Sequence, residues 1–74
     1  MKIAKRELLN MSTDEIAKLT KRKFVGIHLN NGEIKDIYVK NLLGASNPPN
    51  LFYGFITSDD QTIYLPIIDY IELI

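Results

Sequence analysis

The stretch FVGIHLNNGEIKDIYV, residues 24–39, decides the fold class. Its first six residues alternate in hydropathy with a period of two, which is typical of a half-buried strand, and the regularly spaced apolar residues are Val25, Ile27 and Leu29. Asn31-Gly32 then gives the strongest short hairpin signal, because both central residues of a type I′ turn need a positive φ. We therefore expect Glu33 to Val39 to return as a second strand.

The turn length also predicts a register for this hairpin. A two-residue turn would place Leu29 opposite Ile34 and His28 opposite Lys35. Ile34 and Ile37 would then point to opposite faces of the sheet, because side chains alternate along a strand. We expect a bulge or a sharp bend near Lys35-Asp36 that brings both isoleucines to one face.

A helix is expected before the hairpin. Ser12-Thr13-Asp14-Glu15 has the pattern of a capping box, in which the side chains of the first and fourth residues each bond the other's backbone N–H. The helix should run from about Thr13 to about Lys21, with Met11 and Ile16 placed to form a hydrophobic staple. Residues 2–9 have no clean apolar period and are expected to form a short helix or a frayed arm.

Shorter elements are expected after the hairpin. Residues 40–50 are interpreted as the main loop, because Pro48-Pro49 excludes a helix or a central strand there. Strands are predicted at 51–57 and 62–65, joined by the four-residue turn 58–61. Pro66 should end the fourth strand, a 3₁₀ turn should follow at 67–70, and residues 71–74 should form a short fifth strand.

The chain is thus predicted to be one domain, residues 1–74, with a basic helical N-terminus (1–23) and a β-barrel (24–74). One helix followed by about five short strands matches a small SH3-like or Sm-like barrel. An open α+β antiparallel sheet is the alternative.

Residues 12–39 resemble the start of Sm-like proteins, which have a helix, a V-x-I-x-L strand, an Asn/Asp-Gly turn and a bent strand. Here the strand and turn read Val25-Gly26-Ile27-His28-Leu29-Asn30-Asn31-Gly32. Residues 62–66 and Ile71 resemble the closing strands of such barrels. The family's glycine in the bent strand is replaced by Ile37-Tyr38, and its second, RNA-contacting motif has no counterpart around 65–67. The resemblance implies a barrel and carries over no functional residue.

Composition narrows the classes of function. The 74 residues contain no cysteine and one histidine, so disulfides, thiolate metal sites and a zinc site made by the protein alone are not expected. His28 is interpreted as a surface strand histidine, and Asp59-Asp60 as turn residues. No phosphate-binding glycine loop or nucleophile elbow is present. We expect no enzyme activity, no cofactor, no membrane span and a cytoplasmic location.

Charge is divided between the two ends of the chain. Residues 1–23 contain seven Lys or Arg and three Asp or Glu, a net of +4, whereas residues 24–74 contain two and six, a net of −4. The basic cluster at the helix end is interpreted either as a contact for phosphates or an acidic protein face, or as solvated charge that complements the helix dipole. The candidate partner-binding cations at the helix end are Lys18, Lys21, Arg22 and Lys23, which also suit the negative end of the helix dipole.

The apolar side chains need more cover than one small barrel interior gives, from the N-terminal helix, a second subunit or stacked bases. Residues 51–57 carry apolar side chains on both faces, and Tyr53 and Phe55 are the candidate partner-binding residues there. The C-terminus is unusually apolar, and Ile71, Leu73 and Ile74 are candidates for self-association, because exposed strand edges invite pairing. The leading hypothesis is a non-enzymatic protein-interaction module that forms homo-oligomers. The alternative is an Sm-like protein that binds single-stranded RNA through the basic helix.

Overall fold

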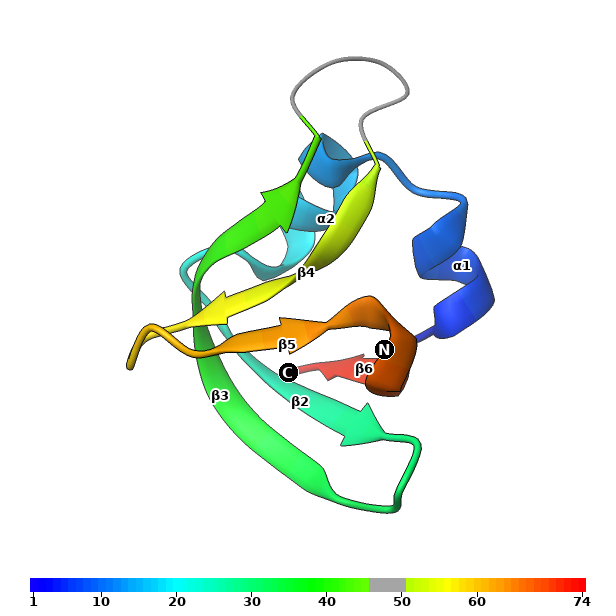
Figure 1. The fold of residues 1–74 in the computed structure, drawn as a ribbon, viewed down its shortest axis with the longest axis vertical. Coiled ribbons are helices and arrows are strands. Elements are labelled where there is room, and N and C mark those ends of the chain that lie inside the picture. The colour runs from blue at the N-terminus through cyan, green and yellow to red at the C-terminus, as the bar shows by residue number, and fades with distance from the viewer. Residues whose placement is uncertain (46–50) are drawn as a thin grey trace.

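The computed structural model describes residues 1–45 and 51–74, and in these the chain is mainly β with two short helices (Figure 1). The expected loop residues 46–50 lie outside the described part. The strands and helices in chain order are β1 (Lys2–Ala4), α1 (Lys5–Leu9), α2 (Thr13–Thr20), β2 (Phe24–Leu29), β3 (Ile34–Gly44), β4 (Phe52–Thr57), β5 (Thr62–Tyr64), the 3₁₀ turn η1 (Leu65–Ile67) and β6 (Ile68–Leu73).

The described strands form one antiparallel sheet in the order β1-β6-β2-β3-β4-β5. β1 and β5 stand at the two ends of this order and do not pair with each other, so the sheet is not closed into a barrel. The mainly β prediction is confirmed, and the alternative of an open antiparallel sheet fits the structure. The observed sheet has six strands instead of five, because a strand precedes the first helix.

The β2–β3 hairpin is present, but its register differs by one residue from the prediction. His28 lies opposite Ile34, and the Leu29 N–H donates to the Glu33 carbonyl at 2.8 Å. Among the described residues, positive φ occurs at Arg22, Asp60 and Gly32, so Asn31 does not adopt the type I′ conformation. The loop has three residues and ends with Gly32 at φ 91°, which is the arrangement of a turn followed by a glycine bulge.

The prediction of a bulge near Lys35-Asp36 is also wrong. The β2–β3 pairing is regular from Phe24–Tyr38 to His28–Ile34, and Ile34 stays exposed on the outer face. The irregularities occur later in β3, where its pairing with β4 shifts after Val39 and again before Gly44. β3 bends there and continues through residues predicted as loop, so it joins both halves of the sheet (Figure 1).

The N-terminal segment folds as expected at α2, and a short helix is present over Lys5–Leu9 as one of the two forms expected for residues 2–9. The capping box is confirmed, since the Glu15 N–H donates to Ser12 Oγ at 3.2 Å and the Ser12 N–H donates to Glu15 Oε1 at 3.3 Å. Residues 2–4 form β1 instead of a helix or a frayed arm, and pair with β6. The edge of β6 is therefore covered by the same chain.

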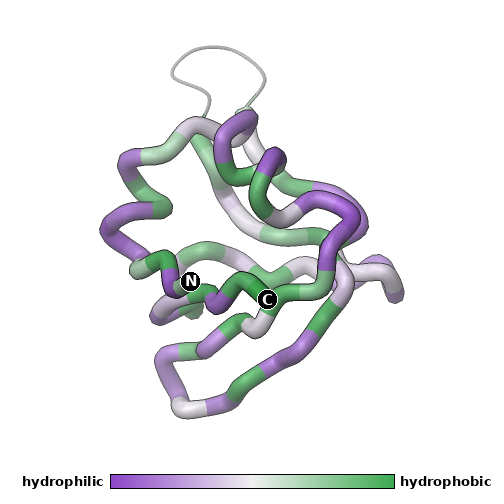
Figure 2. The backbone as a smooth tube through the Cα atoms, turned by 180° about the vertical axis from the view of Figure 1, so that it is seen from behind, coloured by the Kyte–Doolittle hydropathy of each residue, from purple (hydrophilic) through white to green (hydrophobic). Residues whose placement is uncertain are grey.

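The core lies between the strongly bent sheet and the two helices. Thirteen apolar side chains of the described residues are buried, and they come from every strand as well as from α1, α2 and η1. The chain ends are neighbours, because the Leu73 N–H donates to the Met1 carbonyl at 2.8 Å, and both ends lie close together in Figures 1 and 2. None of the helices in the described part has the length and apolar character that crossing a bilayer requires.

Candidate functional site

The predicted cations lie around the connection between α2 and β2. Lys18, Lys21, Arg22 and Lys23 are all exposed. This connection is held against the sheet, because the Arg22 N–H donates to the Val39 carbonyl at 2.7 Å and the Val39 N–H donates to the Lys23 carbonyl at 3.0 Å. The backbone thus presents the basic residues at one fixed corner of the sheet.

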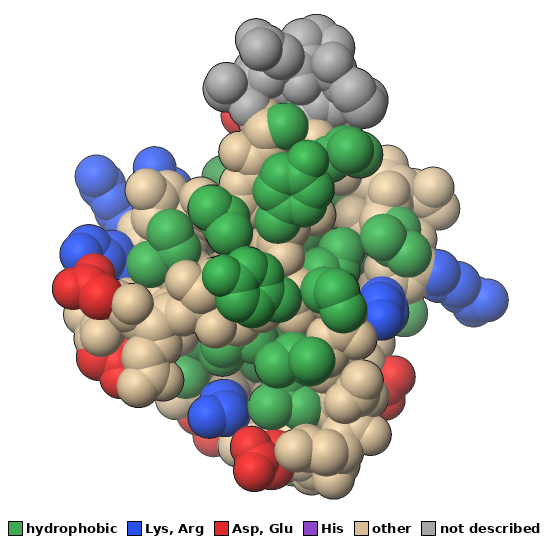
Figure 3. All heavy atoms as spheres, viewed as in Figure 1, with side chains coloured by type: hydrophobic (Ala, Val, Ile, Leu, Met, Phe, Trp, Pro, Cys, Tyr) green, Lys and Arg blue, Asp and Glu red, His purple; other side chains and the backbone are tan. Residues whose placement is uncertain are grey.

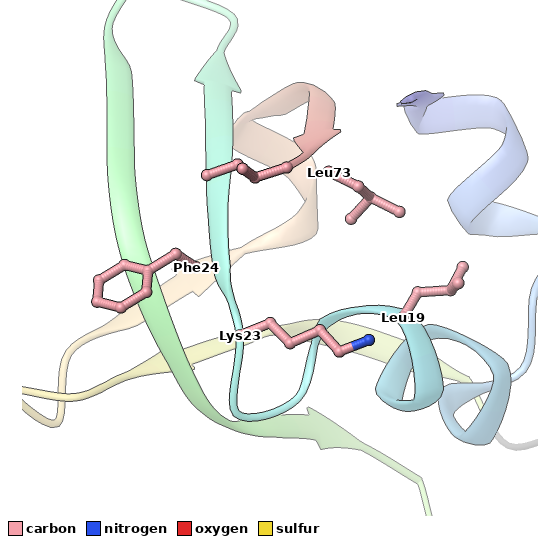
Figure 4. A pocket seen from close by; sticks show the side chains of 5 residues that line it. Leu19, Lys23, Phe24 and Leu73 are labelled. Atoms are coloured by element: carbon pink, nitrogen blue, oxygen red, sulfur yellow. The ribbon is translucent and has the colours of Figure 1, made fainter.

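A first hollow opens beside this corner. It measures about 400 Å³ and is lined by Leu19, Lys23, Phe24, Leu73 and Ile74. Figure 4 shows that Lys23 extends toward α2, whereas Phe24 extends the other way, over β3. The hollow joins the basic corner to the apolar C-terminus, two features that the sequence suggested separately.

A second hollow lies over the outer face of β2. Gly26 is paired with Asp36 on β3 and with Glu72 on β6, so two carboxylates flank a position that has no side chain. A Cβ at Gly26 would lie 3.2 Å from Asp36 Oδ1. The resulting hollow measures about 400 Å³, and its lining residues are Gly26, His28, Ile34, Asp36, Glu72, Leu73 and Ile74.

His28 forms a wall of the second hollow. Its Nε2 lies 3.3 Å from Glu72 Oε1, and its ring stacks on Tyr70 with the ring centroids 4.0 Å apart. The Lys2 ammonium lies 5.1 Å from the centroid of the Tyr70 ring. His28 is therefore held by a stack and a carboxylate, and is less exposed than the surface histidine that the sequence predicted.

A third hollow of about 520 Å³ lies on the β3 side of Phe24. The rings of Phe24 and Tyr38 meet edge to face at 5.2 Å, and together they line one wall. In the same lining the Thr57 hydroxyl donates to the Asp59 carboxylate, and this hydrogen bond lowers the pKa of Asp59. Asp59 therefore remains negatively charged at neutral pH. The other lining residues are Asp36, Ile37 and Ser58.

The three hollows adjoin each other, because the first shares Leu73 and Ile74 with the second and Phe24 with the third. We call the combined area the Phe24 surface. Its centre is apolar and exposed, with Phe24 62% and Ile74 95% accessible. Lys23 lines only the first hollow. The carboxylates of Asp36, Asp59 and Glu72 line only the second and third hollows.

Two predicted site residues lie in the core instead. Phe55 is 0% exposed, because β4 turns this ring inward, where it packs against Phe52 at 4.8 Å between centroids. Ile71 is also fully buried, and its strand runs between β1 and β2. Neither side chain can contact a partner in this fold. Tyr53 is exposed, but it does not line any of the three hollows.

A second apolar area lies elsewhere on the molecule. Figure 3 shows hydrophobic side chains gathered over β4, β5 and η1. The exposed apolar residues of these elements are Tyr53, Tyr64 and Ile67, and Leu51 directly precedes β4. None of these four residues belongs to the Phe24 surface, so the chain presents at least two separate apolar areas.

Sequence reasoning missed Phe24, Gly26, Asp36 and Glu72 as site residues. The alternation within β2 already indicated that Phe24, Gly26 and His28 share one face. Glu72 joins them only through the pairing of β6 with β2, which brings together residues more than 40 positions apart and has no local sequence signal.

The described residues contain no group of three or more His, Cys, Asp or Glu side chains placed to hold a metal ion. The chain was also compared with known proteins at three levels. No protein-family model, no curated protein and no solved structure matches it.

Proposed function

We propose that the chain is a non-enzymatic protein-interaction module that associates with itself through the Phe24 surface. The observation that carries this proposal is the meeting of exposed apolar side chains at the junction of three hollows, with opposite charges on the two sides. Three large, well exposed hydrophobic residues line these hollows, Phe24, Ile34 and Ile74, and their removal from water by a partner lowers the free energy.

The surface has the anatomy of a protein interface. Aromatic side chains in water-excluding pockets dominate binding energy, and Phe24 stands between two of the hollows. Charged residues surround the apolar centre, as expected for an interface rim. A typical specific interface covers about 800 Å² per partner, roughly a sixth of the 4765 Å² accessible surface of this chain. A single hollow would be too small to provide that area, so we expect the interface to include all three hollows.

The test replaces Phe24 with threonine, which keeps a residue suited to a strand but removes the ring. Sedimentation equilibrium should show that the native chain forms oligomers at micromolar concentration and that Phe24→Thr weakens this association at least tenfold. Tyr64→Thr is the matched control, because Tyr64 is also an exposed aromatic strand residue, 54% accessible, and lies outside the Phe24 surface.

Two results would contradict the proposal. A native chain that remains monomeric at several hundred micromolar would remove self-association altogether. Equal weakening by Phe24→Thr and Tyr64→Thr would move the interface away from the Phe24 surface. Circular dichroism of each variant shows whether the sheet is retained, so a loss of association is not confused with unfolding.

The alternative function is Sm-like binding of single-stranded RNA. Its support is the exposure of Lys21, Arg22 and Lys23 beside the exposed Phe24 ring, since phosphates pair with cations and bases stack on aromatic rings. The carboxylates of the adjoining hollows oppose it by repelling phosphate. Fluorescence anisotropy with a labelled single-stranded RNA at low salt tests this alternative, and absence of binding there would exclude it.

A further inference from the structure

We infer that the Phe24 surface docks on the same surface of a second copy about a two-fold axis, so that Lys23 of each copy meets Asp36 of the other. This inference rests on the proposed self-association and specifies its geometry. A two-fold dimer uses one patch on both subunits, and every contact between two different residues then occurs twice.

The first argument is charge. Lys23 and Asp36 are both exposed, and within the described part neither side chain forms an ion pair. Glu72 and Asp60, by contrast, are engaged with His28 and Lys40. Lys23 and Asp36 are thus an exposed cation and an exposed anion at the same surface, and no ion pair among the described residues neutralises either of them.

The second argument is position. Lys23 lines the first hollow and Asp36 lines the other two. Phe24 lies between the first and third hollows, and Leu73 and Ile74 lie between the first and second. A two-fold axis near Phe24 and Ile74 exchanges the two sides, so the basic side of one copy faces the acidic side of the other. A two-fold axis that runs along the line from Lys23 to Asp36 would instead place lysine against lysine, and like charges facing each other across an interface disfavour that arrangement.

The third argument is the shape of the acidic side. Because Gly26 has no side chain, the second hollow can receive a long side chain between the carboxylates of Asp36 and Glu72. A lysine inserted there would place its ammonium near both carboxylates, while its methylene stem lies along apolar Ile34 or Ile74.

The fourth argument concerns the choice of partner. A nucleic acid or a strongly basic protein would suit one side of this surface and be repelled by the other. A second copy of the chain carries both signs in the complementary arrangement, and its formal net charge of zero adds no long-range repulsion.

Charge exchange tests the inference. Lys23→Glu alone and Asp36→Lys alone should each weaken self-association about tenfold at low salt, because two favourable contacts become two repulsive ones. An equimolar mixture of the two single variants should form a heterodimer with affinity within about threefold of the native dimer. The double variant Lys23→Glu/Asp36→Lys should likewise regain the homodimer, and sedimentation equilibrium should give the mass of two chains.

A matched exchange on α1 provides the control. Arg6→Glu and Glu7→Lys reverse two exposed charges that line none of the three hollows, and they should leave the dimer unchanged. If the native chain associates but the mixture of single variants does not recover affinity, the two-fold pairing is wrong while the proposed function stands. If the native chain does not associate at all, the proposed function itself fails.

Discussion

Glycine occupies two interior strand positions, Gly26 and Gly54, where an added methyl group would meet different neighbours. At Gly54 the methyl would press on the backbone of β5, with its carbon 3.1 Å from the Tyr64 Cα and closer still to the Ile63 carbonyl oxygen. Strand backbone cannot move aside without losing pairing. We therefore expect Gly54→Ala to lower the free energy of unfolding by about 2 kcal/mol, measured by urea denaturation.

Gly26→Ala is the matched comparison for that measurement. The nearest atom to its methyl group would be the Asp36 carboxylate oxygen at 3.2 Å, which sits at the end of a side chain that can rotate away. Alanine also restricts the unfolded chain more than glycine. The change in stability should stay below about 1 kcal/mol, and a loss equal to that of Gly54→Ala would show that crowding of β5 is not the cause.

At the scale of elements, β1 is a three-residue strand at one end of the sheet. Its three residues cover the edge of β6, and Ile3 is almost fully buried. Ile3→Ala should lower the free energy of unfolding by about 3 kcal/mol through lost burial and the cavity that remains. Leu9→Ala, at a position 60% exposed in α1, should cost less than about 1 kcal/mol. Similar losses in the two variants would mean that β1 contributes little to the core.

Elements defined by local signals were predicted well. The capping box at Ser12 and the alternation through Val25, Ile27 and Leu29 depend on neighbours in sequence, and α2 and β2 follow both patterns. β1 was missed because a strand of three residues with one buried isoleucine has no period to detect. The hairpin register was wrong because Asn31-Gly32 fits both a two-residue turn and a three-residue loop, and only tertiary packing selects between them.

The candidate surface was predicted only in part, for a similar reason. Lys23, Leu73 and Ile74 were identified from charge and hydropathy, and they meet in the first hollow. Phe55 and Ile71 are equally apolar in sequence, but the bent sheet turns them into the core. Hydropathy alone cannot separate the two groups, because the distinction depends on which strands flank β4 and β6.

The charge distribution of the whole molecule leads to a prediction about salt. The Debye length falls from about 10 Å at 0.1 M to about 3 Å at 1 M salt, so exposed charge contacts between copies weaken while apolar contacts persist. Self-association of the native chain should therefore weaken several-fold between 0.1 M and 1 M NaCl without disappearing. Sedimentation equilibrium at both salt concentrations gives this ratio.

The double variant Lys23→Glu/Asp36→Lys should follow the same salt dependence, because it exchanges the two charges but keeps their attraction. Unchanged or tighter association at 1 M would mean that the apolar centre alone holds the copies together.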